Sequence, residues 1–282
     1  IGPIVPSMIP KIVKKDNLPN AVTLNQATFL ISSVCGHAAG GFLIGYFGVR
    51  WTLIVIIALI FLASLFFFQL NKQHSEYKKE EINVIESMRE GIAYIFKTKE
   101  ILGALCLDMF AVLFGGAVAM IPVFASDILK VGADGFGLLN AASDIGSMMI
   151  IVTLSFIPLR KNQGKILIGV VAGFGLCIIG FGLSKLYWLS FLFLMLSGIF
   201  DGISVVIRGT IVQLKTPDHI RGRVMSANSI FIMSSNEMGQ FESGVAAKLL
   251  GVVRSVVFGG TMTVLIALFV GKFVPKLRKM EY

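Results

Sequence analysis

The sequence contains little charge for its length. Only 15% of its 282 residues are Asp, Glu, Lys or Arg, whereas 55% are hydrophobic, and soluble domains usually carry about 25% charged residues. Its mean hydropathy is +0.83. This composition excludes a water-soluble enzyme. At about 20 residues per bilayer crossing, the chain is long enough for roughly eight membrane-spanning helices.

Cysteine and histidine are also scarce, with three residues of each type. Cys35, Cys106 and Cys177 stand singly within apolar stretches, a spacing that predicts neither disulfides nor a metal site. The sequence contains no HExxH, GxSxG or P-loop pattern. Their absence disfavours a membrane-embedded hydrolase and a nucleotide-driven pump. We therefore expect no catalytic residues, no metal and no bound cofactor.

Long apolar runs dominate what is present. Unbroken runs of around twenty apolar residues exclude a β-barrel, whose strands alternate apolar and polar side chains. The predicted spans lie at about 22–46, 51–70, 101–128, 135–157, 165–183, 187–213, 223–249 and 252–273. A tight turn is expected at 48–50, between the first two spans. The predicted fold class is an all-α integral membrane protein.

The longest polar segment, 71–99, separates the second predicted span from the third. Its second half places six apolar side chains at helical spacing, which predicts an amphipathic helix. This helix would lie against the membrane surface or against the protein body. The six side chains are Val84, Ile85, Met88, Ile92, Ile95 and Phe96.

Basic residues are divided unequally between alternate connections. Of the 25 Lys and Arg residues, 19 lie in 10–20, 71–99, 159–165, 214–223 and 272–282, and Arg208 lies within a span. The positive-inside rule makes these five segments cytoplasmic. Because topology accounts for the net charge of +9, we expect no nucleic-acid partner.

The order of the predicted elements resembles the major facilitator superfamily from its fifth helix onward. This order is two spans, a long charged cytoplasmic loop and six further spans. That superfamily joins two six-helix halves by a cytoplasmic loop, so residues 1–9 would end the fourth helix. The helices before it are expected to lie outside this sequence. The resemblance implies an incomplete N-terminal half at 1–70, a central loop at 71–99, a complete six-helix bundle at 100–274 and a cytoplasmic tail at 275–282.

Local motifs are similar to one branch of that superfamily, the enterobactin-exporter-like and macrolide-efflux-like transporters. Gly36, Gly40 and Gly41 match the antiporter motif Gly-Pro-x-x-Gly-Gly of the fifth helix, although His37 stands where the motif has proline. The resemblance implies that these glycines lie where the two halves meet, whereas ordinary helix packing is the alternative. His37 would be a packing residue or, alternatively, a pH-sensitive group.

Three further segments carry the same resemblance. Residues 108–116, 216–226 and 228–244 resemble the seventh helix, the loop before the eleventh helix and the eleventh helix itself. The resemblance implies that Asp218, Arg221 and Arg223 form a cytoplasmic gate loop held by ion pairs. A solvated charged loop is the alternative.

Ionised groups inside the predicted spans are the candidate functional residues, because a charge at mid-bilayer costs at least about 2.5–3.5 kcal/mol. The substrate or proton pathway candidates are Asp108, Asp144, Asp201, Arg208, Glu237, Glu242 and the neighbouring Asn236. At about 1.5 Å per residue, Asp144, Asp201 and Glu237 lie near the middle of the bilayer. One carboxylate would exchange a proton during transport. Alternatively, each is held by a partner and fixes helix packing.

Arg208 follows Asp201 by seven residues, about 10 Å along a helix axis, so direct pairing between them is not expected. Its side chain would reach toward the cytoplasmic end. Alternatively, it would be a counter-ion for an anionic substrate or for a carboxylate on a neighbouring helix. Asn25, Gln26 and Asn140 would line a water-filled path or join helices.

These features favour a secondary active transporter of the plasma membrane with alternating access. It would export a small amphipathic molecule, such as a drug, macrolide or siderophore, with a proton gradient as the energy source. A non-transporting receptor of the same fold, or a channel, is the alternative. We expect a monomer whose partners are the lipid bilayer and a small-molecule substrate. The N-terminal loop, central loop and C-terminus would be cytoplasmic.

Overall fold

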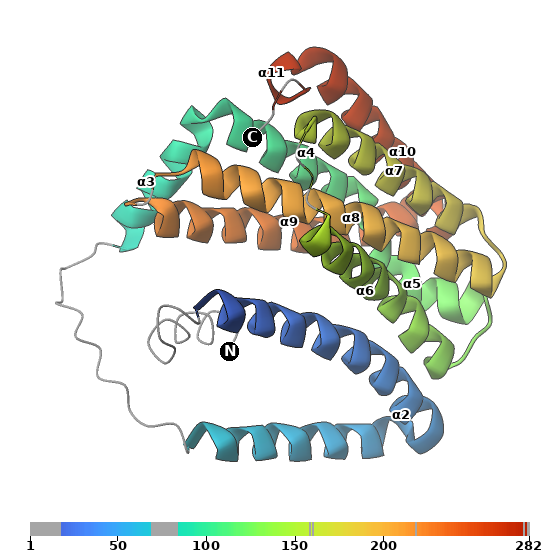
Figure 1. Ribbon diagram of the computed structural model, residues 1–282. Helices are drawn as coiled ribbons and strands as arrows, with labels where there is room; N and C mark the ends of the chain where they lie inside the picture. The colour runs from blue at the N-terminus through green and yellow to red at the C-terminus, as the bar shows by residue number, and fades with distance from the viewer. Residues whose placement is uncertain are drawn as a thin grey trace. The chain divides into compact units, whose positions relative to one another are not determined.

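The computed structural model describes residues 18–68, 84–157, 159, 161–217, 219–278 and 280. All regular secondary structure in these residues is helical, which confirms the all-α class. The elements are α2 (Leu18–Phe68), α3 (Val84–Lys97), α4 (Lys99–Gly115), η2 (Ala117–Met120), α5 (Ile121–Val123), η3 (Phe124–Ile128), α6 (Ala133–Phe156), α7 (Gln163–Leu183), α8 (Tyr187–Lys215), α9 (Arg221–Leu250), α10 (Val252–Phe273) and α11 (Pro275–Arg278) (Figure 1). The described residues form two compact units, 18–68 with 132–141, and 84–131 with 142–280.

Six helical segments of the described chain are long and apolar enough to cross a membrane. They are Ile31–Phe66, Lys99–Ile128, Ala133–Leu154, Gln163–Leu183, Tyr187–Lys215 and Val252–Phe273. The sequence predicts eight spans, and the difference arises in two places. The first segment contains the break at Gly48 and so joins two predicted spans. The α9 helix has 30 residues, but its many polar side chains keep it out of this set.

The α2 helix consists of two arms that meet at Gly48 (Figure 1). Gly48 has φ 76° and ψ 166°, a conformation that glycine adopts readily and that residues with a Cβ do not. The buried Thr52 hydroxyl donates a hydrogen bond to the Gly48 carbonyl oxygen at 3.0 Å, which caps the bend. The bend lies within the predicted turn at 48–50.

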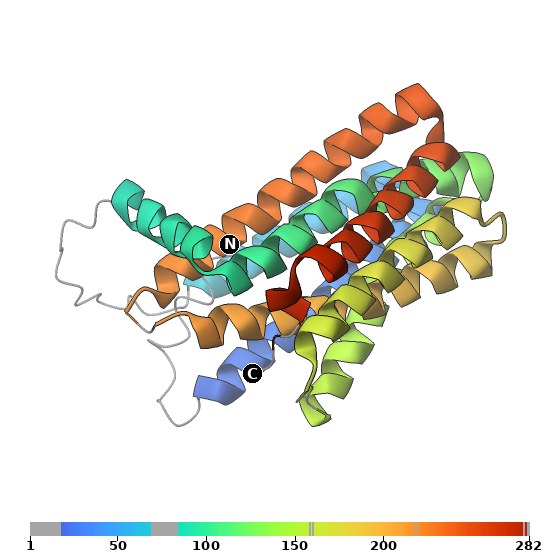
Figure 2. The ribbon, with the colours of Figure 1, turned by 90° about the horizontal axis from the view of Figure 1, so that it is seen from above.

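In the second unit, α7 packs most extensively against α10 and α8, and α4 packs against α10 and α9. Figure 2 shows these helices from above, with α7 beside α10 and α4 beside α9. Their contacts bury a continuous apolar core, which includes Ile101, Leu107, Leu167, Ile207 and Val224. Close packing of such side chains adds dispersion attraction between these helices.

The α3 helix joins this core. Ile95 is fully buried within it, and the Tyr94 hydroxyl donates to the Lys215 carbonyl oxygen at the end of α8, at 2.6 Å. Phe96 remains 58% exposed. Of the two surfaces proposed for this amphipathic helix, the structure places its buried face against the protein body. The preceding residues 69–83 lie outside the described part of the chain.

The predicted span 101–128 is not one continuous helix. The α4 helix ends at Gly115, Gly116 has ψ 41°, and short turns η2, α5 and η3 continue the path, with Pro122 in α5. Two side chains satisfy backbone groups around this interruption. Ser243 of α9 donates to the Gly116 carbonyl oxygen, and Thr263 of α10 donates to the Ala111 carbonyl oxygen, both at 3.2 Å. Such side-chain hydrogen bonds make a broken helix tolerable inside a bilayer.

Candidate functional site

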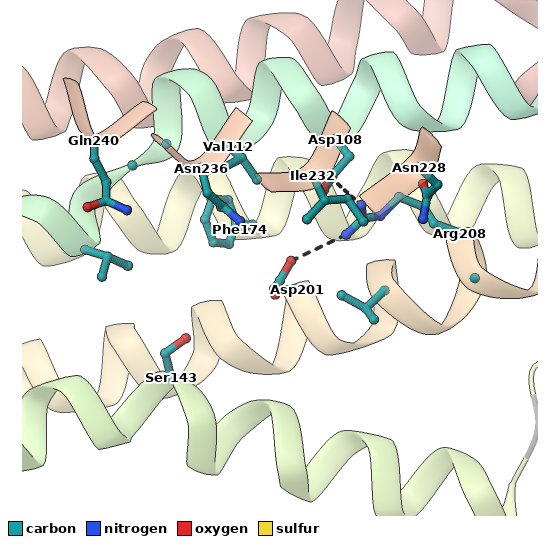
Figure 3. Close-up of a pocket in the computed structure, with 15 residues that line it drawn as sticks. Asp108, Val112, Ser143, Phe174, Asp201, Arg208, Asn228, Ile232, Asn236 and Gln240 are labelled. Atoms are coloured by element: carbon teal, nitrogen blue, oxygen red, sulfur yellow. Dashed lines mark hydrogen bonds and ion pairs between the residues drawn. The ribbon is translucent and has the colours of Figure 1, made fainter. Parts of the chain in front are cut away.

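A cavity of about 460 Å³ lies in the second unit among α4, α6, α7, α8 and α9 (Figure 3). Its volume falls within the range of roughly 300–1,000 Å³ that is typical of small-molecule sites. Its polar and charged lining residues are Asp108, Ser143, Asp201, Arg208, Asn228, Asn236 and Gln240. Its apolar lining side chains are Val112, Val118, Phe174, Val205 and Ile232. Such a wall combines apolar surface with a few convergent polar groups.

Arg208 lies between two carboxylates in this cavity, as the dashed lines in Figure 3 show. Its Nη1 atom forms an ion pair with Asp108 Oδ2 on α4, and its Nη2 atom lies 4.0 Å from Asp201 Oδ1. Its Nε atom donates to the Ser204 hydroxyl at 3.2 Å. The guanidinium is thereby fixed on three sides and joins α8 to α4.

The structure corrects the expectation that Arg208 and Asp201 do not pair. Side chains on an α-helix lean toward its N-terminus, so the long Arg208 side chain reaches back along α8 toward Asp201. The same direction excludes an extension toward the predicted cytoplasmic end, and Arg208 is only 6% exposed. Its pairing with Asp108 corresponds to the neighbouring-helix alternative.

The two carboxylates have different surroundings. The Asp108 side chain is 8% exposed and the Arg208 side chain 7%, whereas the Asp201 side chain is 43% exposed. Asp201 is fourteen residues from Tyr187 and fourteen from Lys215, about 21 Å from either end of α8. The exposed carboxylate therefore lies at the centre of a membrane-length helix and faces the cavity.

One wall of the cavity depends on Gly115. A Cβ at Gly115 would lie 2.7 Å from Phe174 Cε1 and 3.1 Å from Thr263 Oγ1. The missing side chain therefore makes room for the Phe174 ring of α7 beside the end of α4. Figure 3 labels this ring among the residues that line the cavity.

The α9 helix supplies a second wall through every fourth residue. Four of its residues line the cavity: Asn228, Ile232, Asn236 and Gln240. Residues four apart lie on the same face of an α-helix. The Asn228 Oδ1 atom is buried and accepts no hydrogen bond from the described residues. Of the residues on this face, only Asn236 was predicted as a candidate from the sequence. The spacing of its polar residues by four or eight positions was the signal that could have found the others.

Three of the predicted candidates lie outside the cavity. Glu237 and Glu242 line a separate groove of about 710 Å³, here called the lateral groove, with Leu113, Met238, Phe241, Val245, Ala246, Leu249, Leu250 and Phe258. Asp144 is partly exposed and does not line either space, although its neighbour Ser143 lines the cavity. The structure thus brings Asp108, Asp201, Arg208 and Asn236 together.

The weaker polar candidates are dispersed. The Asn140 side chain donates to the Phe136 carbonyl oxygen of its own helix at 3.2 Å, and the His37 side chain is exposed. The side chains of Asn25 and Gln26 lie outside the described part of the structure. These positions therefore add nothing to the cavity that the structure describes.

The predicted gate loop contacts α3. Arg223 Nη1 forms an ion pair with Glu90 Oε2, and the two side chains are 43% and 44% exposed. Arg221 donates to the Thr216 carbonyl oxygen at 3.4 Å, and Asp218 lies outside the described residues. The first turn of α9 is therefore attached to α3 by at least one half-exposed ion pair.

Among the three motif glycines, Gly41 makes the close helix contact. Within the first unit, a Cβ at Gly41 would lie 2.6 Å from the Ala133 carbonyl oxygen and 2.6 Å from Gly137 Cα. A Cβ at Gly36 or Gly40 would meet no described atom within 4 Å. The motif thus permits α2 and the beginning of α6 to touch at Gly41.

Comparison with known proteins places this architecture in a family. The sequence profile of the transmembrane secretion effector family matches residues 2–282. The uncharacterized MFS-type transporter YfmI of Bacillus subtilis (strain 168) is 24% identical over 277 residues, which cover 95% of this chain and 68% of YfmI. The enterobactin exporter EntS of Citrobacter koseri is 23% identical over 272 residues, which cover 96% of this chain and 65% of EntS.

The chain therefore spans about two thirds of the length of these relatives. Family and relatives are membrane transporters rather than a class of enzyme. The interruption after α4, the motif glycines and the charged cavity all lie within the matched region. The chain belongs to the transmembrane secretion effector family of the major facilitator superfamily transporters.

Proposed function

We propose that the protein is a secondary active exporter that binds a small amphipathic molecule in the cavity and couples its movement to protons. The observation that carries this proposal is the Asp201 carboxylate, which is 43% exposed to the cavity at the centre of α8. A charged group at this depth is costly and is typical of substrate and proton pathways. The family match and the named exporter EntS support the direction of transport.

The charges around Asp201 support the proposal of proton coupling. Asp108 on α4 and Arg208 on α8 are the other charged residues among those that line the described cavity. With both carboxylates ionised, the three groups carry a net charge of −1, and a proton on Asp201 makes the group neutral. Binding of a proton and binding of substrate would therefore compete at one carboxylate, and that competition produces exchange in an alternating-access protein.

We further propose that the protein is a monomer in the plasma membrane with its central loop and C-terminus in the cytoplasm. The distribution of Lys and Arg, with 19 of 25 residues in alternate connections, supports this orientation. The ion pair between Arg223 and Glu90 would then lie at the cytoplasmic end of the helices. There it would hold α3 against the first turn of α9.

Transport by the full-length protein in proteoliposomes tests the proposal. An imposed pH gradient should drive export of amphipathic fluorescent dyes, and Asp201→Asn should reduce this export by at least about tenfold, the loss of one charge interaction. Glu237→Gln removes a carboxylate of similar depth outside the cavity and should leave export near the wild-type rate. Dye movement that ignores the gradient would indicate a channel, and gradient-driven export by Asp201→Asn at the wild-type rate would remove Asp201 from coupling.

A further inference from the structure

We infer that the cavity selects amphipathic organic cations and that Asp201 holds their charged group. This inference rests on the proposed function, since it specifies the substrate class of the same site. It concerns the sign of charge that the cavity accepts, which neither the family match nor the names of the relatives state.

The pairing of charges is the first support. The buried Arg208 guanidinium forms its ion pair with Asp108, while its distance to Asp201 is 4.0 Å. One negative charge therefore remains on the cavity wall, on the carboxylate that is the most exposed of the three groups. An anionic ligand would face this charge and would have to displace Asp108 to reach Arg208. A cation meets an accessible carboxylate at no such cost, and the apolar surroundings strengthen the attraction.

The aromatic wall is the second support. Phe174 and Asp201 line both the cavity and a small adjoining space of about 10 Å³, so the ring and the carboxylate belong to one part of the site. The face of an aromatic ring attracts cations. Gly115 provides the room for this ring, because a Cβ there would lie 2.7 Å from Phe174 Cε1. A cation beside Asp201 thus has an aromatic neighbour as well as a counter-ion.

The remaining lining explains why the ligand should be amphipathic. Val112, Val118, Val205 and Ile232 offer apolar surface, which favours hydrocarbon or aromatic groups around the charge. Asn228, Asn236 and Gln240 add uncharged polar groups on the α9 wall of the cavity. The class is therefore a lipophilic monocation, including protonated amines.

Two probes of the same shape and opposite charge test the inference. Tetraphenylphosphonium and tetraphenylborate each carry four phenyl groups, and equilibrium dialysis against the purified full-length protein in detergent measures their binding without any gradient. The phosphonium should bind at least about 100-fold more tightly than the borate, since both the carboxylate and the ring favour a positive charge. Asp201→Asn should weaken phosphonium binding by about tenfold or more, as expected for one lost ionic contact.

Two further variants keep the result interpretable. Glu237→Gln, in the lateral groove, should bind the phosphonium as the wild type does, and Asp201→Glu should retain most of the binding because it keeps the charge. The inference would be overturned if the protein bound both probes equally or preferred the borate. It would also be overturned if a folded Asp201→Asn variant bound the phosphonium as tightly as the wild type. Gradient-driven export of anions alone would also overturn it while the proposed function stands. Phosphonium binding without any coupled export would contradict the proposed function instead.

Discussion

The guanidinium of Arg208 on α8 and the carboxylate of Asp108 on α4 form an ion pair across a hundred residues of sequence, with both side chains less than 10% exposed. Such a pair must be preserved as a unit, because a single buried charge without its partner is far more costly than the pair. It fixes the position of the one cationic side chain that lines the described cavity.

Asp108→Asn should therefore reduce the free energy of unfolding by about 3 kcal/mol, because it leaves the Arg208 charge buried with the weaker Asp201 contact alone. Thermal unfolding in detergent measures the loss. The double variant Asp108→Asn with Arg208→Gln should recover at least half of it. A double variant no more stable than Asp108→Asn alone would show that the pair does not act as a unit.

Gly41→Ala should destabilise the contact between α2 and α6 by about 1–3 kcal/mol, the usual cost of overpacking. Its Cβ would lie 2.6 Å from backbone atoms of Ala133 and Gly137, which cannot rotate away. The matched control is Gly40→Ala, whose Cβ meets no described atom within 4 Å and which should gain up to about 1 kcal/mol of helix propensity. Melting temperatures that fall equally in both variants would argue against the Gly41 contact.

Thr263→Val should cost about 1 kcal/mol, the net value of a typical hydrogen bond. It removes the bonds from the Thr263 hydroxyl to the Ala111 and Gly259 carbonyl oxygens beside the break in α4. Thr261→Val is the control, because its exposed hydroxyl bonds only the Val257 carbonyl oxygen within α10 in the described structure. The two unfolding curves should separate, and identical curves would count against a role for Thr263 in holding the broken helix.

The ion pair between Arg223 and Glu90 should contribute little to global stability. Both side chains are more than 40% exposed, so Glu90→Gln should cost about 0.2–1 kcal/mol at low salt and less at high salt. The charge-exchanged variant Glu90→Arg with Arg223→Glu should restore the low-salt value. A loss above 2 kcal/mol, on the order of a buried pair, would mean that the pair is screened from solvent.

The proposed orientation predicts which connections react from outside the cell. In a variant whose three cysteines are replaced, Asn162→Cys between α6 and α7 should resist a membrane-impermeant maleimide, whereas Lys185→Cys between α7 and α8 should react. Both native side chains are exposed, so access depends on the side of the membrane rather than on burial. The reverse labelling pattern would invert the topology derived from basic residues.

Helix positions were predictable because apolar runs of membrane length have few alternatives. The predicted spans 165–183, 187–213 and 252–273 agree within two residues at each end with α7, α8 and α10. The amphipathic spacing after Val84 likewise located α3. The interruption after Gly115 was missed, since glycine and proline are common in unbroken membrane helices as well. The hydroxyls that bond to backbone carbonyls around that break come from α9 and α10, which are distant in sequence.

The site was predicted only in part for the same reason. Depth along a helix is readable from sequence, and it correctly placed Asp201 at the centre of its span. The direction in which a side chain points around the helix is not readable from sequence. Glu237 therefore looked equivalent to Asp201, although its side chain lies in the lateral groove. The importance of Asp108 depends on α4 and α8 being neighbours, and no pattern within either segment states that relationship.

If the cavity binds substrate as proposed, the hydroxyl of Thr263 gives α10 an indirect influence on which ligand is bound. This side chain does not line the cavity, but its hydroxyl donates a hydrogen bond to the Ala111 carbonyl oxygen of α4. It also lies beside the space that Gly115 leaves for the Phe174 ring. A substitution at Thr263 would therefore shift the Phe174 ring and change the dimensions of the cavity without altering any residue that lines it. In the proposed exporter, substrate preference would then change through a position that does not contact the transported molecule.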